Sequence, residues 1–184
     1  MEIERRFFVR NVEEKPWMKP QSRRTIEQYY LDSERFSTQG DMLVYDSKHH
    51  LASLSRDEIC LFEEEKEWTS RIRICDDVAT VTLKGKRIHA SALELEWNVD
   101  RHLTSRILED AEFPAVFKSR YLWVDGDGNT WEIDHFEGTL EGLVLAEIEL
   151  SSIDDEIHIP QWIGAEITGK HQWSNSSLAY NGIP

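Results

Sequence analysis

The chain has 184 residues with an apolar fraction of 40% and an aromatic fraction of 10%, enough for one packed domain and too short for two ordinary ones. Its 21 Lys and Arg residues stand against 35 Asp and Glu residues, which gives a formal charge of −14. Such an acidic protein repels nucleic acids and anionic membranes at long range, so we expect neither as a partner. A phosphate-bearing ligand would need a local basic pocket or metal ions.

The sequence also indicates a compartment. Its first residues form no apolar signal segment, no apolar run approaches the length of a membrane span, and two cysteines are too few for a disulfide framework. These features predict a cytoplasmic protein. The sequence leaves open whether the chain forms a homodimer.

Eight short segments alternate between apolar and polar residues with a period of two, and turn-forming residues separate them. Asp76-Asp77 and Asp125-Gly126-Asp127-Gly128 are suited to hairpin turns. The segments predict strands at about residues 2–9, 24–31, 68–75, 78–84, 91–99, 117–125, 129–136 and 143–150.

Three other regions break this pattern. Asp100 is a candidate N-cap for a short helix over about residues 101–110, and the C-terminal region is expected to end in another short helix. Residues 32–67 form a long polar stretch with apolar islands. A connection of this length is usually a lid, a small subdomain or a mobile segment, and the sequence does not choose among them.

Charged residues occur in like-charged pairs two residues apart, which places both members on one face of a strand. For a single strand, the default interpretation is a half-buried sheet with its charges in water. Together the pairs favour a lumen, because like charges on one face cost energy unless metal ions or opposite charges compensate them. The acidic pairs are Glu2/Glu4, Glu94/Glu96, Glu132/Asp134 and Glu147/Glu149, and the basic pairs are Arg71/Arg73, Lys84/Lys86 and Lys118/Arg120.

The order of these pairs resembles a known family. The opening Glu2-Ile3-Glu4-Arg5-Arg6 resembles the ExExK signature of the CYTH superfamily of triphosphate tunnel metalloenzymes, and Arg71-Ile72-Arg73 is similar to its RxR pair. Further segments similar to the family lie at residues 25–31, 80–86, 94–96, 118–121, 131–134, 147–149 and 174–179.

The resemblance implies a mainly β (α+β) fold, an eight-stranded closed antiparallel β-barrel with a few peripheral helices. Residues 1–184 would form one such tunnel domain with an inserted segment at about residues 32–67. The implied activity is metal-dependent hydrolysis of inorganic tripolyphosphate or a related triphosphate, with Mg²⁺ or Mn²⁺ as the cofactor.

Site residues follow from the same resemblance, position by position. The family pattern assigns metal binding to Glu2, Glu4, Asp134, Glu147 and Glu149. It assigns triphosphate binding to Arg71, Arg73, Lys84, Lys118 and Arg120. Arg6 and Asp134 take the catalytic positions, where Asp134 would assist the metal and orient the attacking water.

Two departures from the family pattern bear on activity. Position 6 holds Arg where the motif has Lys, and a planar guanidinium fork does not replace a compact ammonium. Residues 32–67 stand where the family has a short turn. The remaining alternatives are a class IV-type adenylate cyclase that makes cyclic AMP from ATP, a thiamine triphosphate hydrolase, and a polyphosphate- or nucleotide-binding module with little turnover.

Overall fold

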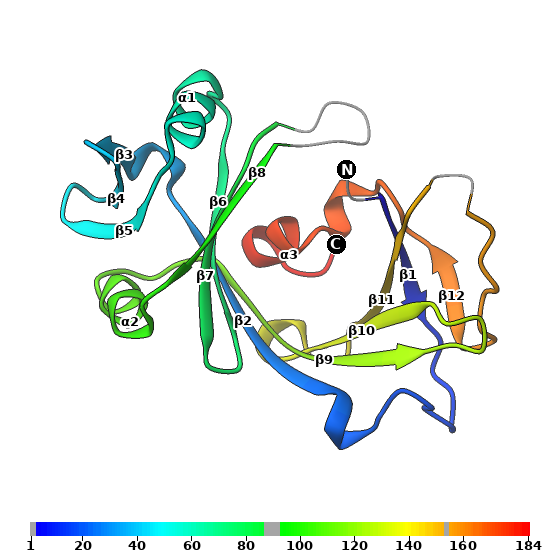
Figure 1. The fold of residues 1–184 in the computed structure, drawn as a ribbon. Helices are drawn as coiled ribbons and strands as arrows, with labels where there is room; N and C mark the ends of the chain where they lie inside the picture. The colour runs from blue at the N-terminus through cyan, green and yellow to red at the C-terminus, as the bar shows by residue number, and fades with distance from the viewer. Residues whose placement is uncertain (1–2, 87–92, 153–154) are drawn as a thin grey trace. The chain divides into compact units, whose positions relative to one another are not determined.

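The computed structural model describes residues 3–86, 93–152 and 155–184 and has mainly antiparallel β-structure with three α-helices (Figure 1). It confirms the eight predicted strands, apart from Glu2 and residues 91–92, which lie outside the described residues. These strands are β1 (Ile3–Val9), β2 (Arg23–Leu31), β6 (Thr69–Cys75), β7 (Val78–Lys84), β8 (Glu94–Val99), β9 (Ala115–Val124), β10 (Thr130–Phe136) and β11 (Val144–Leu150).

The chain divides into two compact units. The first unit comprises residues 1–26 and 116–184, and the second comprises residues 27–115. In the first unit the strand order is β12-β1-β11-β10-β9, where β12 (Ile163–Glu166) is a strand that the sequence patterns did not predict. In the second unit the order is β2-β6-β7-β8, and β2 itself is divided between the units after Ile26.

One face of the first unit's sheet is a closely packed apolar surface. Phe7, Trp131, Ile133 and Ile148 project from neighbouring strands into one cluster, since they occupy alternate positions on their strands. Trp17, which is 1% exposed, packs against this cluster from the segment between β1 and β2. The burial of these side chains fixes which face of each strand carries the charged residues.

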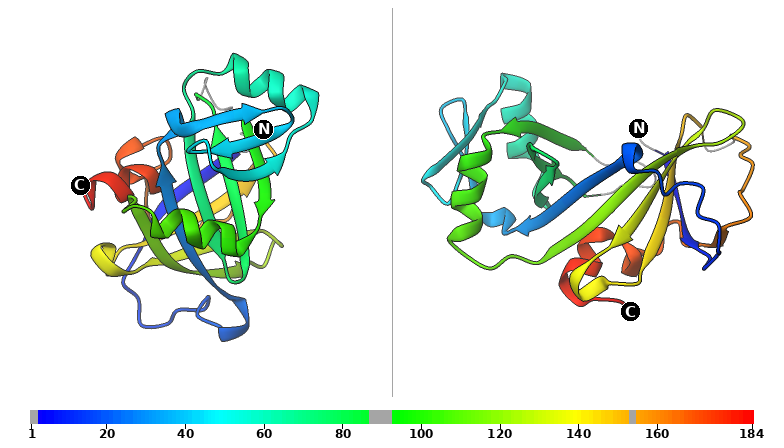
Figure 2. Two further views of the ribbon diagram at one scale, coloured as in Figure 1. Left: turned by 90° about the vertical axis from the view of Figure 1, so that its left-hand side faces the viewer. Right: turned by 90° about the horizontal axis from the view of Figure 1, so that it is seen from below.

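The opposite face is apolar only at one end, where a C-terminal helix covers it. Helix α3 (Asn175–Asn181) begins at Ser174, whose hydroxyl accepts a hydrogen bond from the Ser177 amide. Its Leu178 packs with Phe136 and Leu145, so α3 lies against the sheet end where β10 ends and β11 begins (Figure 2). This confirms the predicted terminal helix.

The second unit is built around the β6-β7-β8 meander. Asp76 adopts a φ of 52° in the two-residue turn between β6 and β7, as expected for a tight hairpin. Ile72, Val81 and Leu83 form a core together with Ile107 of α2 (Arg101–Glu109). The side chain of Asp100 accepts a hydrogen bond from the Leu103 amide, which confirms the predicted N-cap.

Residues 32–67 form an ordered subdomain of the second unit. Its three-stranded sheet consists of β3 (Phe36–Gln39), β4 (Met42–Tyr45) and β5 (His49–Ser53), and α1 (Arg56–Glu64) follows (Figure 1). A capping box between Ser55 and Glu58 starts α1. The apolar islands noted in the sequence supply Leu43 and Tyr45 to the same core as Ile72. None of the described helices is long and apolar enough to cross a membrane.

We expect Leu43→Ala to lower the free energy of unfolding by about 2–5 kcal/mol, because Leu43 is fully buried in this shared core. Chemical denaturation followed by circular dichroism measures the effect. The exposed Asp57→Ala on α1 is the control and should change stability by less than about 0.5 kcal/mol. Equal stability of the two variants would show that residues 32–67 do not contribute to the core.

Candidate active site

Strands β1, β9, β10 and β11 turn most of their charged side chains to one face of the first unit's sheet, and Arg5 of β1 points to the other face. Successive residues of a strand point to opposite faces, and the intervening residues form the apolar cluster around Trp131. We term the other surface the charged face. Its members are Glu4, Arg6, Lys118, Arg120, Glu132, Asp134, Glu147 and Glu149.

The strand register orders these side chains in rows. Arg6 lies opposite Glu147, which in turn lies opposite Glu132, so one row crosses three strands. One step along, Glu4 lies opposite Glu149. Carboxylates that face one another across strands repel, and nearby cations are needed to compensate this repulsion.

A buried ion cluster lies at the centre of the charged face. The Arg120 guanidinium contacts the Asp134 carboxylate with two donors, Nε to Oδ1 and Nη2 to Oδ2, each at 2.7 Å. The Lys118 ammonium contacts the same Oδ2 and also lies over the ring of Phe136. Asp134 and Lys118 are only 1% and 2% exposed. We term these three charged residues the Asp134 cluster.

The charges around Asp134 determine its ionisation. Burial by itself would raise the pKa of this carboxyl, but the charges and hydrogen bonds of Lys118 and Arg120 outweigh it and lower the pKa. Burial would lower the pKa of Arg120, and the carboxylates around it raise the pKa instead. Asp134 is therefore held as the anion that its two cationic partners require.

Arg6 connects the first strand to the same network. Its Nε lies 2.6 Å from Oε1 of Glu147, although the N–H is not directed at that oxygen, so the contact is an ion pair without a hydrogen bond. Its Nη2 donates to Glu4 Oε1 at 3.2 Å, and its Nη1 donates to the carbonyl of Trp173 at 3.1 Å. The guanidinium thus bridges two carboxylates and the C-terminal segment.

The donor set of the charged face is suited to a hard divalent cation. Five carboxylates stand against three cations, which leaves an excess of two negative charges. Burial and the neighbouring carboxylates raise the pKa of Glu132, and the charge of Arg120 offsets only part of that effect. All potential ligands are oxygen atoms, which Mg²⁺ and Mn²⁺ prefer. Among the residues described, no three acidic, His or Cys side chains are already arranged as a metal site.

The second unit has its own basic surface on β6 and β7. Arg71 and Arg73 point away from the unit's core, and Lys84 lies on the same face at the end of β7. Lys84 pairs with Glu94 at 3.0 Å. Arg71 reaches Glu94 only at 3.6 Å, and its buried Nε has no hydrogen-bond partner within the described part of the chain. Arg71 therefore has donor capacity for an anionic ligand.

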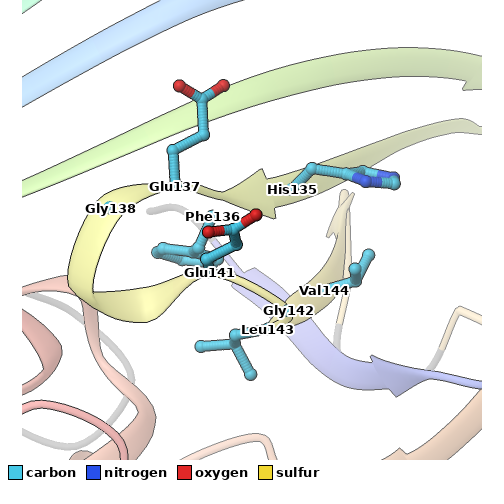
Figure 3. A pocket seen from close by; sticks show the side chains of 8 residues that line it. All are labelled: His135, Phe136, Glu137, Gly138, Glu141, Gly142, Leu143 and Val144. Carbon is cyan, nitrogen blue, oxygen red and sulfur yellow. The ribbon is translucent and has the colours of Figure 1, made fainter.

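A pocket of about 460 Å³ lies at a different place in the first unit. It is formed where β10 leads through a 3₁₀ turn at Gly138–Leu140 into β11, and the side chains of His135, Glu137 and Glu141 line it (Figure 3). None of the charged-face residues lines this pocket. It is separate from the candidate site.

Comparison with known proteins gives clear relatives. An inorganic triphosphatase of Acetivibrio thermocellus is 39% identical to this chain over 118 residues, which are 64% of this chain and 75% of that protein. This chain belongs to the CYTH superfamily of triphosphate tunnel metalloenzymes. An inorganic triphosphatase of Nitrosomonas europaea is 33% identical over 91 residues, which are 48% of this chain and 60% of that protein.

Solved structures show the same CYTH fold. The crystal structure of the inorganic triphosphatase NE1496 matches this chain with a TM-score of 0.61 and 24% identity, covering 97% of this chain and 94% of that one. No protein-family model matches the chain.

Most residues assigned from the CYTH pattern lie on two surfaces of the structure. Glu2 lies outside the described residues. Within the second unit, Arg71, Arg73 and Lys84 share one face. The charged face of the first unit brings together Glu4, Arg6, Lys118, Arg120, Asp134, Glu147 and Glu149.

The sequence assignment did not include Glu132 among the site residues. The structure places Glu132 in the row with Arg6 and Glu147, and its carboxylate contacts the Arg120 guanidinium. The signal was present in the sequence, because Glu132 and Asp134 are two residues apart on one strand and must share a face.

We expect Asp134→Asn to lower the free energy of unfolding at neutral pH by about 3–5 kcal/mol, because the buried Lys118 would lose its carboxylate partner and Arg120 would keep only Glu132 and Glu147. Denaturant unfolding across pH measures the effect. The folded-state pKa of Asp134 is lowered, so its contribution is complete above the unfolded pKa of about 3.9 and is lost as the pH falls below it. The difference from wild type should therefore narrow in acid.

The control for this substitution is Asp127→Asn in the exposed turn between β9 and β10, which should leave stability within about 0.5 kcal/mol of wild type. A loss below about 1 kcal/mol for Asp134→Asn, constant across pH, would mean that the Asp134 cluster is not the electrostatic centre of the charged face.

Proposed function

We propose that this chain is a metal-dependent triphosphatase that hydrolyses inorganic tripolyphosphate to pyrophosphate and phosphate. The observation that carries the proposal is the charged face, where carboxylates opposed in register outnumber their cations. Membership of the CYTH superfamily and the activity in the names of the two relatives support the same reaction. Both relatives are named for an inorganic substrate, which favours tripolyphosphate over ATP or thiamine triphosphate.

The proposed architecture is the closed tunnel of the superfamily. On this proposal the eight sequence-predicted strands form one barrel, residues 1–184 act as one functional domain, and the charged face and the basic surface around Arg71 both line the lumen. Carboxylates would then hold the cation while arginine and lysine side chains hold phosphate oxygens, a division of tasks that suits phosphoryl transfer.

We propose Mg²⁺ or Mn²⁺ as the cofactor, held by Glu2, Glu4, Glu147 and Glu149 with assistance from Asp134. When bound, the ion supplies neutralisation and polarisation of phosphoryl oxygens. Glu132 lies opposite Glu147 on the neighbouring strand and is suited to act as a further metal ligand. The contacts of Asp134 with Lys118 and Arg120 suit it to positioning those cations, alongside its proposed part in orienting water.

The phosphate-holding role is assigned to Arg71, Arg73, Lys84, Lys118 and Arg120. The Nε of Arg71 supports it most directly, because this buried donor has no hydrogen-bond partner among the described residues and such a donor gains most from an anionic ligand. Lys118 and Arg120 already have carboxylate partners, so their contribution depends on sharing those partners with the substrate.

We expect wild-type protein to release phosphate from tripolyphosphate only when Mg²⁺ or Mn²⁺ is present. Glu4→Gln should reduce kcat/KM on the order of 100-fold, because it removes one negative ligand from the metal set. A colorimetric phosphate assay with and without chelator measures both effects. Glu141→Gln, which lines the separate pocket, should behave as wild type. Equal rates for wild type and Glu4→Gln would refute the metal assignment.

We expect Arg71→Gln to raise the KM for tripolyphosphate by about tenfold or more with a smaller effect on kcat, since it removes a charged donor that binds ground state and transition state alike. Initial rates over a range of tripolyphosphate concentrations measure this split. The matched control is Arg56→Gln on the exposed start of α1. An unchanged KM for Arg71→Gln would remove Arg71 from the substrate site.

The second candidate function is a triphosphate-binding module with little turnover, and the contact between Arg6 and Glu147 is the observation that favours it. Calorimetry that detects metal-dependent tripolyphosphate binding, with no phosphate released on long incubation, would support this function instead. Production of cyclic AMP from ATP would identify the chain as an adenylate cyclase.

A further inference from the structure

Arg6 contacts Glu4 and Glu147, two of the carboxylates that are proposed to bind the metal ion. Its guanidinium lies 2.6 Å from Glu147 Oε1 and 3.2 Å from Glu4 Oε1. These two carboxylates come from different strands, and the guanidinium fork spans both. A cationic side chain therefore lies where a metal ion would find its first two ligands.

Each carboxylate oxygen of Glu147 already has a cationic partner. Arg6 contacts its Oε1, and Nη2 of Arg120 donates to its Oε2 at 3.3 Å. The Glu147 side chain is only 10% exposed, so solvent screens these contacts weakly. A divalent ion bound at about 2.0–2.6 Å from these carboxylate oxygens would lie next to the positive charges of Arg6 and Arg120, which repel it. Arg6 and Arg120 therefore compete with a metal ion for Glu147.

Arg6 is held in this position from several sides. Its Nη1 donates to the carbonyl of Trp173, and its backbone amide donates to the Thr168 hydroxyl. Its own carbonyl accepts a hydrogen bond from the Ile167 amide at 2.8 Å. Its side chain is 14% exposed. The guanidinium contacts Glu4, Glu147 and the Trp173 carbonyl at the same time. A lysine ammonium is a compact group and does not span these three acceptors in the way that the planar guanidinium does.

We propose that Arg6 is an internal counter-ion that keeps Glu4 and Glu147 from binding metal until a triphosphate is present. This inference rests on the proposed function. A triphosphate brings several negative charges to which the Arg6 guanidinium can transfer, and this frees Oε1 of Glu147 for a cation that arrives with the substrate. Arg6 then sets the order of binding and the metal affinity of the free protein.

A purely structural role for Arg6 has a different consequence. If Arg6 only fixed the C-terminal segment through Trp173, its removal would lower stability and leave the metal affinity of the free protein unchanged or weaker. Competition for the carboxylates instead predicts that removing the positive charge strengthens metal binding, because a nearby like charge is lost. The sign of the change in metal affinity separates the two roles.

The test measures Mn²⁺ binding in the absence of substrate, by calorimetry and by the electron paramagnetic resonance signal of free Mn²⁺. We expect Arg6→Gln to bind Mn²⁺ at least about tenfold more tightly than wild type. Adding Glu147→Gln to Arg6→Gln should abolish that gain. Arg5→Gln is the matched control and should bind Mn²⁺ as wild type does, because the adjacent Arg5 pairs with Glu166.

A second measurement needs no variant. Imidotriphosphate, in which NH groups replace the bridging oxygens, should let wild-type protein take up Mn²⁺ beyond the amount that the analogue chelates in solution. Without the analogue, wild-type uptake should be weak. This pair of measurements keeps the inference testable even if Arg6→Gln folds poorly.

Two results would overturn the inference. Wild type could bind Mn²⁺ as tightly as Arg6→Gln, or Arg6→Gln could bind it more weakly. If the same wild-type preparation still releases phosphate from tripolyphosphate in a metal-dependent way, only the role of Arg6 fails. If no variant binds Mn²⁺ and no preparation releases phosphate, the proposed function fails as well.

Discussion

The contact of Arg120 and Lys118 with the Asp134 carboxylate is the interaction on which the charged face depends. Lys118 and Asp134 are nearly excluded from water here and Arg120 is mostly buried, which costs free energy unless every charge has a partner. Arg120 extends the cluster outward, because the same guanidinium also reaches Glu132 and Glu147. From Glu147 the contacts continue to Arg6 and Glu4. Opposite charges thus alternate along one connected network.

This alternation makes the charged face both ordered and responsive to ligands. Outside the Asp134 cluster, Glu4, Glu132 and Glu147 each have an arginine partner, which an entering cation could replace or an entering phosphate could attract away. The side chain of Glu149 makes no hydrogen bond or ion pair with any residue described. The apolar cluster on the other side of the sheet keeps the strands in register while such exchanges take place. A rigid backbone can therefore carry side chains whose partners change.

The sequence predicted the strands well and their ionic partners poorly. Period-two alternation located eight strands, because each strand has one apolar face whose burial requires that pattern. Residues 32–67 remained undecided, since their strands are only four or five residues long and their apolar residues join a core formed elsewhere in the chain. Strand β12 was missed because its four residues, Ile-Gly-Ala-Glu, show no alternation.

The ionic contacts of the candidate site could not be predicted from the sequence, because they depend on the register between strands. Alternation places Glu4, Arg6 and Glu147 on faces of their own strands, but only the register of β1 with β11 puts Arg6 opposite Glu147. That register joins residues about 140 positions apart in the chain, and a sequence alone does not fix it. The pairing of Arg120 with Asp134 likewise depends on how β9 and β10 align.

The hydrogen bond from Arg6 to the Trp173 carbonyl has an evolutionary consequence. The acceptor belongs to the backbone, so any residue at position 173 can provide it, and the indole is free to vary for reasons of packing alone. What must persist is the path of the chain between Ile167 and Asn175. Insertions or deletions between Ile167 and Asn175 would displace the carbonyl that Arg6 contacts, whereas single substitutions there would leave this acceptor in place.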